Sequence, residues 1–314
     1  MNQNAVLLCG HGSRDPQAVG EFDIAAAALR ARLASLAPAG DVADFAAGYL
    51  EFARPTIGEA LAALRARGAS RIVAVPGMLF AASHVKNDLP WEMNSFMAAN
   101  PGTEIHLARD LAIDAKLLEA AAERIAAVAP QNREEALLVV VGRGTTDPDA
   151  NSNIAKITRL LWEGMGFGWA ETAFSGVAQP RVEGALDRAA RLGFRRIVVF
   201  PYFLFTGILV KRIRAETARA RARFPAIEFI DAPYLSDHER VIDAFLDRIA
   251  EAEAGVAAMN CQLCKYRIRM VGYDDAVGAP QVGHHHHVRG IGVGSDHDHP
   301  HEHPHDHPHP HEHD

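Results

Sequence analysis

The sequence has few cysteines, no long apolar run and no excess of basic charge. Its three cysteines, Cys9, Cys261 and Cys264, are too few and too unevenly spaced for a disulfide framework, which favours a reducing compartment. No apolar run approaches the roughly 18 residues that span a bilayer. The first apolar run also lacks the preceding basic residues of a secretory signal. We therefore expect a cytoplasmic protein with no membrane partner.

The formal net charge of −7 comes from one end of the chain. Residues 271–314 contain eight acidic residues and one basic residue, whereas the remainder contains equal numbers of both. A neutral body lacks the basic face that nucleic acid requires, so no nucleic-acid partner is expected. With 314 residues, of which 48% are hydrophobic, the chain is long enough to form two ordinary domains with sizeable cores.

A short apolar run near the N-terminus ends at a histidine between two glycines, Gly10-His11-Gly12. Such a run is typical of a buried parallel strand that leads into a tight turn. Ligands bind at the carboxyl ends of strands in open α/β sheets, so we expect His11 to meet one there. The glycines indicate unusual backbone angles or the close approach of a flat ligand. A turn histidine without chemistry is the alternative.

Apolar periodicity predicts alternating strands and helices over the first 130 residues. We expect helices at 17–36, 56–67 and 111–129, and further strands at 41–49, 71–76 and 103–108. Thr56 is the expected N-cap of the second helix, and Gly68 its stop. A second histidine, His84, lies beyond the strand at 71–76. The βαβα order predicts a doubly wound parallel sheet.

The same order recurs in the second part of the chain. Residues 137–142 align with the opening strand at an offset of 132, and residues 196–205 align with the 72–80 segment at an offset of 125. Two homologous α/β halves are the simplest explanation. We predict domains at 1–130 and 131–255, arranged around a central cleft.

The two copies differ at both histidines. Arg143 stands where the first copy has His11, and Leu209 stands where it has His84. Neither replacement is a metal ligand, and the loss of both histidines indicates a shared task that the first half alone performs.

Two imidazoles at the ends of neighbouring strands can hold a divalent ion such as Co²⁺, Fe²⁺, Ni²⁺ or Zn²⁺ and leave coordination positions open. Because their ordinary pKa values lie near neutrality, they can also accept protons from a substrate. Both roles fit a tetrapyrrole chelatase, whose substrate loses two pyrrole protons as the ion arrives.

Three segments carry a resemblance to a known family: residues 10–16, the loop 49–55 and the segment 76–90. They resemble the sirohydrochlorin cobaltochelatases in their long CbiX form, and the resemblance covers residues 5 to about 250 and extends to the tail. It implies a class II chelatase fold and ATP-independent insertion of Co²⁺ into sirohydrochlorin in cobalamin biosynthesis. By motif, His11 and His84 would bind the ion and accept the pyrrole protons.

Further candidates for the cleft are charged residues in the same loops. Glu51 is a candidate proton shuttle or ligand for the incoming ion, with a solvated loop carboxylate as the alternative. Sirohydrochlorin carries many carboxylates, so cations near the cleft are candidates to bind them. Four such cations lie in the strand-end loops: Arg14, Lys86, Arg143 and Lys211. Ordinary surface charge is the alternative for each.

A linker at 256–270 contains Cys261 and Cys264, spaced to bind one metal or one edge of a cluster. Long members of the resembled family carry such a Met-x-Cys-x-x-Cys motif, which is associated with an iron–sulfur cluster. A [4Fe-4S] cluster needs four ligands, so a homodimer would share it or Cys9 would contribute. A zinc site and a redox disulfide are the alternatives.

Residues 271–314 are rich in Gly, Pro, Asp and His, so we expect a disordered metal-binding tail. Its histidines form one block and one alternating series, which include His284, His285, His286, His287, His297, His299, His301 and His303. The alternation with Asp, Glu and Pro differs from a uniform affinity tag. We expect the tail to store or deliver Co²⁺ or Ni²⁺ near the cleft, without a part in the chemical step.

The leading hypothesis is therefore a cobaltochelatase that acts on sirohydrochlorin. An iron or nickel chelatase is the nearest alternative, because two histidines discriminate poorly among these ions. A metal storage or delivery protein is a second alternative, although storage needs no paired cleft. A histidine phosphatase is disfavoured, since Gly10 stands before His11 where that class has arginine.

Overall fold

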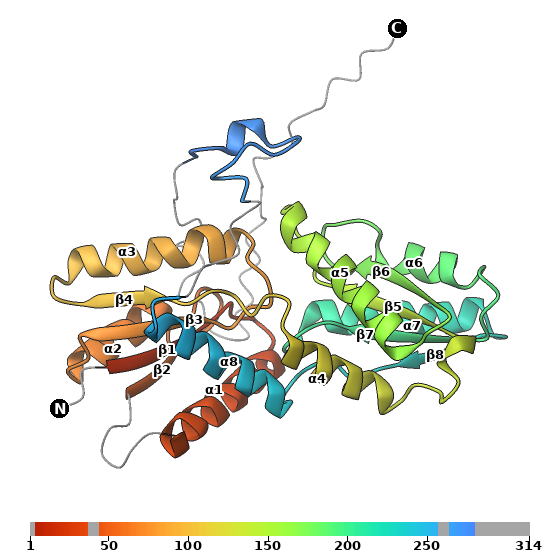
Figure 1. Ribbon diagram of the computed structural model, residues 1–314, viewed down its shortest axis with the longest axis horizontal. Coiled ribbons are helices and arrows are strands. Elements are labelled where there is room, and N and C mark those ends of the chain that lie inside the picture. Colours follow the sequence, from red (N-terminus) through yellow and green to blue (C-terminus); the bar gives the residue numbers. More distant parts are fainter. Residues whose placement is uncertain (1–3, 37–43, 257–263, 280–314) are drawn as a thin grey trace, which may run out of the picture.

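The computed structural model describes residues 4–36, 44–256 and 264–279, and the first two of these ranges form two α/β halves (Figure 1). Within these residues, no helix is long and apolar enough to cross a membrane. Each half is built around one parallel sheet of four strands. The predicted fold class, two homologous doubly wound domains, is confirmed.

The first sheet has the strand order β2-β1-β3-β4. Its strands are β1 (Asn4–Gly10), β2 (Asp44–Tyr49), β3 (Arg71–Pro76) and β4 (Glu104–Leu107). The helices of this part of the chain are α1 (Pro16–Leu36), α2 (Ile57–Ala66), α3 (Leu89–Ala99) and α4 (Ala115–Ala126), with a π-helical turn at His84–Asp88. The predicted capping residue is confirmed, because the Thr56 hydroxyl accepts a hydrogen bond from the Glu59 amide.

The second sheet repeats the first with the order β6-β5-β7-β8. Its strands are β5 (Ala136–Gly142), β6 (Trp169–Phe174), β7 (Arg196–Pro201) and β8 (Glu228–Asp231). The helices are α5 (Pro148–Met165), α6 (Val182–Ala189), α7 (Ile208–Arg223) and α8 (Glu239–Glu253), and short 3₁₀ turns occur at Arg133–Glu135 and Asp274–Ala276. Gly10 pairs with Tyr49 as Gly142 pairs with Phe174, so the register is repeated as well as the order.

Both faces of each sheet are covered, which explains why the central strands are apolar throughout. In β1, Leu7 packs with the residues of α2 and α3, whereas Leu8 packs on the opposite face with those of α1. In β5, Val139 faces α6 and α7, and Val140 faces α5. Successive side chains of a strand point to opposite faces, so one strand contributes to two cores.

Two helices cross between the halves. Helix α8 follows the second sheet in the chain but packs on α1, β3 and β4 of the first half, and α4 packs against α5 of the second (Figure 1). One hydrophobic core therefore runs through both halves. The predicted boundary between 1–130 and 131–255 separates the two sheets but not the helices that cover them.

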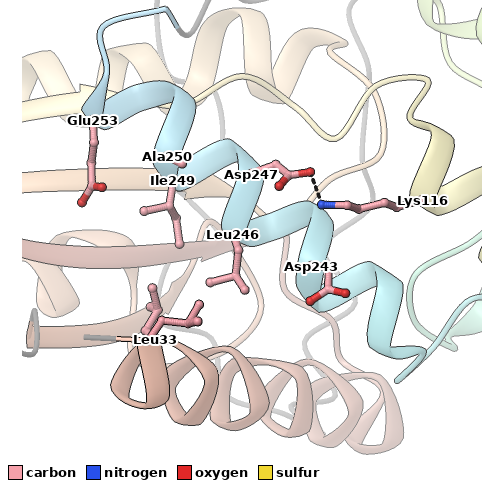
Figure 2. A pocket seen from close by; sticks show the side chains of 9 residues that line it. Leu33, Lys116, Asp243, Leu246, Asp247, Ile249, Ala250 and Glu253 are labelled. Atoms are coloured by element: carbon pink, nitrogen blue, oxygen red, sulfur yellow. Dashed lines mark hydrogen bonds and ion pairs between the residues drawn. The ribbon is translucent and has the colours of Figure 1, made fainter. Parts of the chain in front are cut away.

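A surface hollow of about 360 Å³ marks the place where α1, α4 and α8 meet. Figure 2 shows Leu246 and Ile249 of α8 on the side that faces Leu33 of α1, while Lys116 of α4 bonds to Asp247. None of the predicted site residues lines this hollow. It belongs to the crossing of the helices rather than to the predicted cleft.

Candidate metal site

Three predicted site residues converge at the carboxyl ends of adjacent strands. His11 follows β1, Glu51 follows β2, and His84 begins the π-helical turn that lies beyond β3. The Nε2 atom of His11 lies 3.0 Å from Nε2 of His84 and 3.3 Å from Oε1 of Glu51. Among the described residues, these three form the one group of three or more side chains that could hold a metal ion.

Each of the two flanking glycines allows a close contact beside His11. Gly12 has a φ of +95°, and a Cβ atom there would lie 1.6 Å from the Glu51 carbonyl oxygen. A Cβ atom on Gly10 would lie 2.8 Å from the Phe22 ring. The Glu51 amide also donates a hydrogen bond to the His11 carbonyl, at 3.0 Å. Gly12 therefore lets the loop that carries Glu51 pack against the His11 loop, and Gly10 leaves room for the Phe22 ring.

The second ring nitrogen of each histidine faces an acceptor. His11 Nδ1 lies 3.0 Å from the Gly12 carbonyl, and His84 Nδ1 lies 2.9 Å from the Asp88 carboxylate. A carbonyl and a carboxylate accept hydrogen bonds, which assigns the imidazole proton to Nδ1 in both rings. The two Nε2 atoms then face one another beside the Glu51 carboxylate. When both rings are neutral, each Nε2 atom offers a lone pair to a metal ion.

The separations of these atoms suit one shared ion. A Zn²⁺-like ion binds imidazole nitrogen at about 2.0–2.1 Å, which places two ligand atoms about 2.8–3.4 Å apart at angles between a right angle and the tetrahedral angle. The 3.0 Å and 3.3 Å separations lie within that range. About a quarter of the His11 side chain is exposed, so the site is open on one side. An open coordination position is what an ion needs if it is to be passed on.

His11 is held in its neutral form. Burial, together with the nearby His84 and Arg143, lowers its pKa to about 3, although Glu51 acts in the opposite direction. A neutral imidazole keeps its lone pair for a metal ion at physiological pH. For the same reason His11 is a weak proton acceptor, so the two predicted roles of this residue do not fit it equally well.

The four predicted cations occupy different places. Arg143 extends from the second half to His11, with its Nη2 atom 3.2 Å from the His11 Nε2. The Arg14 guanidinium lies 5.0 Å from the centre of the Phe52 ring, and Phe52 follows Glu51 in the chain. These two cations border the site.

The two lysines hold the halves together instead. Lys86 is 3% exposed, and its Nζ atom lies 2.8 Å from Asp147 and 3.2 Å from Asp149. Burial lowers the Lys86 pKa, but the two carboxylates together outweigh it, so the pKa lies above its usual value. Lys211 binds Asp15 of the first half at 2.5 Å. We had expected both lysines to bind substrate carboxylates, and the structure instead pairs them with carboxylates of the opposite half.

Sequence reasoning missed Asp88 and Asp147. Asp88 is 2% exposed and orients His84, and it lies four residues after it, which is contact spacing on a helix. The four-residue spacing of His84 and Asp88 could have indicated this contact only if residues 84–88 had been predicted to be helical. Asp147 is equivalent to Asp15 at the offset of 132, so the repeat could have indicated a second cross-half pair.

The cysteine and tail predictions stay largely untested. Cys261 and the tail histidines, including His284 and His297, lie outside the described residues. Cys264 is buried and free. Cys9 is also buried in β1, and burial raises its pKa, which disfavours the thiolate that a cluster requires. The shared cluster and the homodimer therefore stay predictions.

Together, the duplicated fold and this site define a class of protein: two parallel α/β halves with two imidazoles and a carboxylate at the strand ends of one of them. The CbiX family model matches residues 5–128 and 137–252, which is most of the chain. The chain belongs to the CbiX family. The matched residues include both halves, in agreement with the repeat.

Relatives of the chain carry two names. It is 33% identical to the sirohydrochlorin cobaltochelatase of Priestia megaterium over 275 residues, which cover 86% of this chain and 87% of that one. It is 31% identical to the sirohydrochlorin ferrochelatase of the same organism over 236 residues, which cover 75% of this chain and 85% of that one. SirB from Bacillus subtilis with Fe³⁺ has a similar structure, with a TM-score of 0.71 and 27% identity over 83% of this chain and all of SirB.

Proposed function

We propose that this chain inserts a divalent metal ion into sirohydrochlorin. The observation that carries the proposal is the convergence of His11 Nε2, His84 Nε2 and Glu51 Oε1 at separations of 3.0 and 3.3 Å. These atoms form a ligand set for a borderline ion, and their open side leaves room for the tetrapyrrole. The relatives named as sirohydrochlorin chelatases support the choice of substrate.

In this proposal the ligands divide their tasks. His11, whose pKa is about 3, serves as a neutral ligand. His84 lies 2.9 Å from the Asp88 carboxylate through Nδ1, and this contact orients the ring so that its Nε2 atom faces the site. As the ion passes to the pyrrole nitrogens, the two displaced pyrrole protons go to His84 and the Glu51 carboxylate, which the departing ion has freed.

We propose cobalt as the ion, and cobalamin biosynthesis as the setting. The support is that the cobaltochelatase relative is matched over more of this chain than the ferrochelatase relative, 86% against 75%. Iron is the second candidate, because SirB structures hold Fe³⁺ in one case and cobalt in another. The ligand set does not choose between these ions, since imidazole suits both.

The test is the absorbance change of sirohydrochlorin after mixing with the protein and one ion at a time, without oxygen and without ATP. The expected result is insertion with Co²⁺ at a rate above that with Fe²⁺ or Ni²⁺, also when the ions compete. Faster insertion of Fe²⁺ would transfer the assignment to a ferrochelatase. No acceleration with any of the three ions would contradict the proposed activity.

For the tail, we propose delivery of the ion without a part in the chemical step. Removal of residues 271–314 is expected to leave the rate unchanged at saturating Co²⁺ and to lower it only when Co²⁺ is scarce, because tethered imidazoles raise the local ion concentration. Loss of activity under both conditions would contradict this role.

A further inference from the structure

Arg143 lies where the duplication brings the ends of two strands together. It follows Gly142 at the end of β5 as His11 follows Gly10 at the end of β1. The two equivalent residues meet across the halves, with Arg143 Nη2 3.2 Å from His11 Nε2. A guanidinium only donates hydrogen bonds, so the imidazole nitrogen accepts this one.

The nitrogen that Arg143 contacts is the one that the metal ion needs. His11 Nδ1 is directed to the Gly12 carbonyl, which leaves Nε2 as the available lone pair. One lone pair cannot bind the guanidinium and a metal ion at the same time. An incoming ion therefore has to displace Arg143, and the exposed position of this residue gives its side chain room to move into solvent.

Glu51 offers the Arg143 guanidinium an opposite charge when no ion is bound. The carboxylate is 4% exposed, and its charge interacts with that of Arg143. A buried carboxylate without a nearby cation is strongly unfavourable. Arg143 contributes positive charge beside Glu51 in the ion-free protein. In the ion-bound protein, the metal ion would supply that positive charge.

We propose that Arg143 is a displaceable counter-ion of the metal site. It leaves His11 when the ion binds, returns when the ion departs for the tetrapyrrole, and so lowers the affinity of the site for the ion. Two imidazoles and a carboxylate alone form a strong ligand set, which would favour retention over transfer. Repulsion between a guanidinium and a divalent ion in a partly buried site opposes retention. This inference rests on the proposed function.

The test is Co²⁺ binding to the full-length chain in the absence of tetrapyrrole. Wild type and Arg143→Gln are each titrated beside the same protein carrying His84→Ala, so that binding by the tail histidines cancels in the difference. We expect the His84-dependent Kd to fall by about ten-fold or more in Arg143→Gln. Insertion at saturating Co²⁺ and sirohydrochlorin is expected to become slower, because the ion leaves less readily.

Two further variants sharpen the test. Arg143→Lys keeps the charge and is expected to shift the Kd less than Arg143→Gln. Arg196→Gln removes the same charge at the amino end of β7, the opposite edge of the sheet, where Arg196 pairs with Glu228. It is expected to leave the Kd and the insertion rate unchanged.

An unchanged His84-dependent Kd in Arg143→Gln would overturn the proposal. If the KM for sirohydrochlorin rose at the same time, Arg143 would instead bind a substrate carboxylate, and the proposed function would stand. A wild-type protein with neither His84-dependent Co²⁺ binding nor insertion would contradict the proposed function, and this inference with it.

Discussion

The two halves share a scaffold and differ at each position that could ligate metal. Strand order and register are the same in both sheets. The proposed ligands of the first half and their counterparts in the second are His11 and Arg143, Glu51 and Gly176, and His84 and Leu209. A sheet needs only buried apolar strands, which both copies keep, whereas an ion needs three particular side chains. The two halves therefore share one fold, and only the first half carries the residues proposed to bind metal.

The halves also bind each other through equivalent residues. Lys86 pairs with Asp147, and its counterpart Lys211 pairs with Asp15, the counterpart of Asp147. The Lys86 pair is buried, but more than half of the Lys211 side chain is exposed. The buried pair holds the turn that contains His84, so the second half supports the proposed metal site without contributing one of its proposed ligands.

A third difference lies beneath the loops that follow β3 and β7. The Ala81 amide donates to Asp110 of the same half, whereas the equivalent Thr206 amide donates to Glu21 of the opposite half. Asp110 is 1% exposed, and its second carboxylate oxygen has no hydrogen-bond partner among the described residues. Burial raises the pKa of Asp110 to about 6. The loop that carries His84 is thus anchored on a carboxylate that is costly to ionise.

Among the substitutions that test the difference between the halves, the largest expected effect is the loss of insertion rate on replacement of His84. His84→Ala removes a proposed ligand and proton acceptor, and the insertion rate is expected to fall by about 10²-fold or more. Leu209→Ala, at the equivalent position of the second half, is expected to leave the rate close to that of wild type. Equal losses in both variants, measured by sirohydrochlorin absorbance, would mean that the halves do not divide the chemistry as argued.

The second comparison is between the two lysines. Lys86→Met leaves Asp147 and Asp149 buried without their cation, and the free energy of unfolding is expected to fall by about 3–5 kcal/mol. Lys211→Met breaks an exposed pair, and its expected cost is about 0–1 kcal/mol. Urea unfolding at neutral pH measures both. A larger cost for Lys211→Met would contradict the assigned order.

The third prediction concerns the pH dependence that Asp110 confers. Its folded pKa of about 6 lies above the ordinary 3.8, so the folded chain binds this proton more tightly than the unfolded chain. The associated stability is present below pH 3.8 and is lost as the pH rises through 6. Asp110→Asn does not titrate. Its stability relative to wild type is therefore expected to rise by roughly 2–3 kcal/mol between pH 4 and pH 7.

Unfolding of both proteins by urea at several pH values tests this prediction. A stability difference that stays constant from pH 4 to pH 7 would show that Asp110 ionises in the folded protein as it does in the unfolded chain.

The smallest expected effect distinguishes the caps of two equivalent helices. Thr56 and Glu59 form a capping box at the start of α2, whereas Arg181, the cap of α6, makes no side-chain capping bond. Thr56→Ala is expected to lower the free energy of unfolding by about 1 kcal/mol, and Arg181→Ala by less. Thermal unfolding measures the stability of both variants. A larger loss of stability in Arg181→Ala than in Thr56→Ala would contradict this prediction.

Much of the local structure was predictable because its causes are local. The strand at 71–76 matches β3, since an apolar run that ends in proline determines both of its limits. The helix expected from residue 111 begins at Ala115 instead, because the Asp114 side chain caps it by accepting a bond from the Lys116 amide. The proximity of His11 and His84 followed from the rule that parallel strands end at one edge.

Other features depend on contacts that periodicity does not encode. An amphipathic pattern shows which face of α8 is buried but not which sheet buries it, so the crossing of α4 and α8 could not be predicted. Lys86 and Asp147 are 61 residues apart, and their pairing needs both halves in place. The π-helical turn at His84–Asp88 was missed because its residues give no regular apolar pattern.

The most direct test of the account is the position of Co²⁺ in crystals of the full-length chain, located by anomalous scattering. We predict an ion bound by Nε2 of His11, Nε2 of His84 and a carboxylate oxygen of Glu51, with the Arg143 guanidinium moved away from His11. An ion bound at the counterpart positions in the second half, or only at the tail histidines with these three side chains bare, would contradict it.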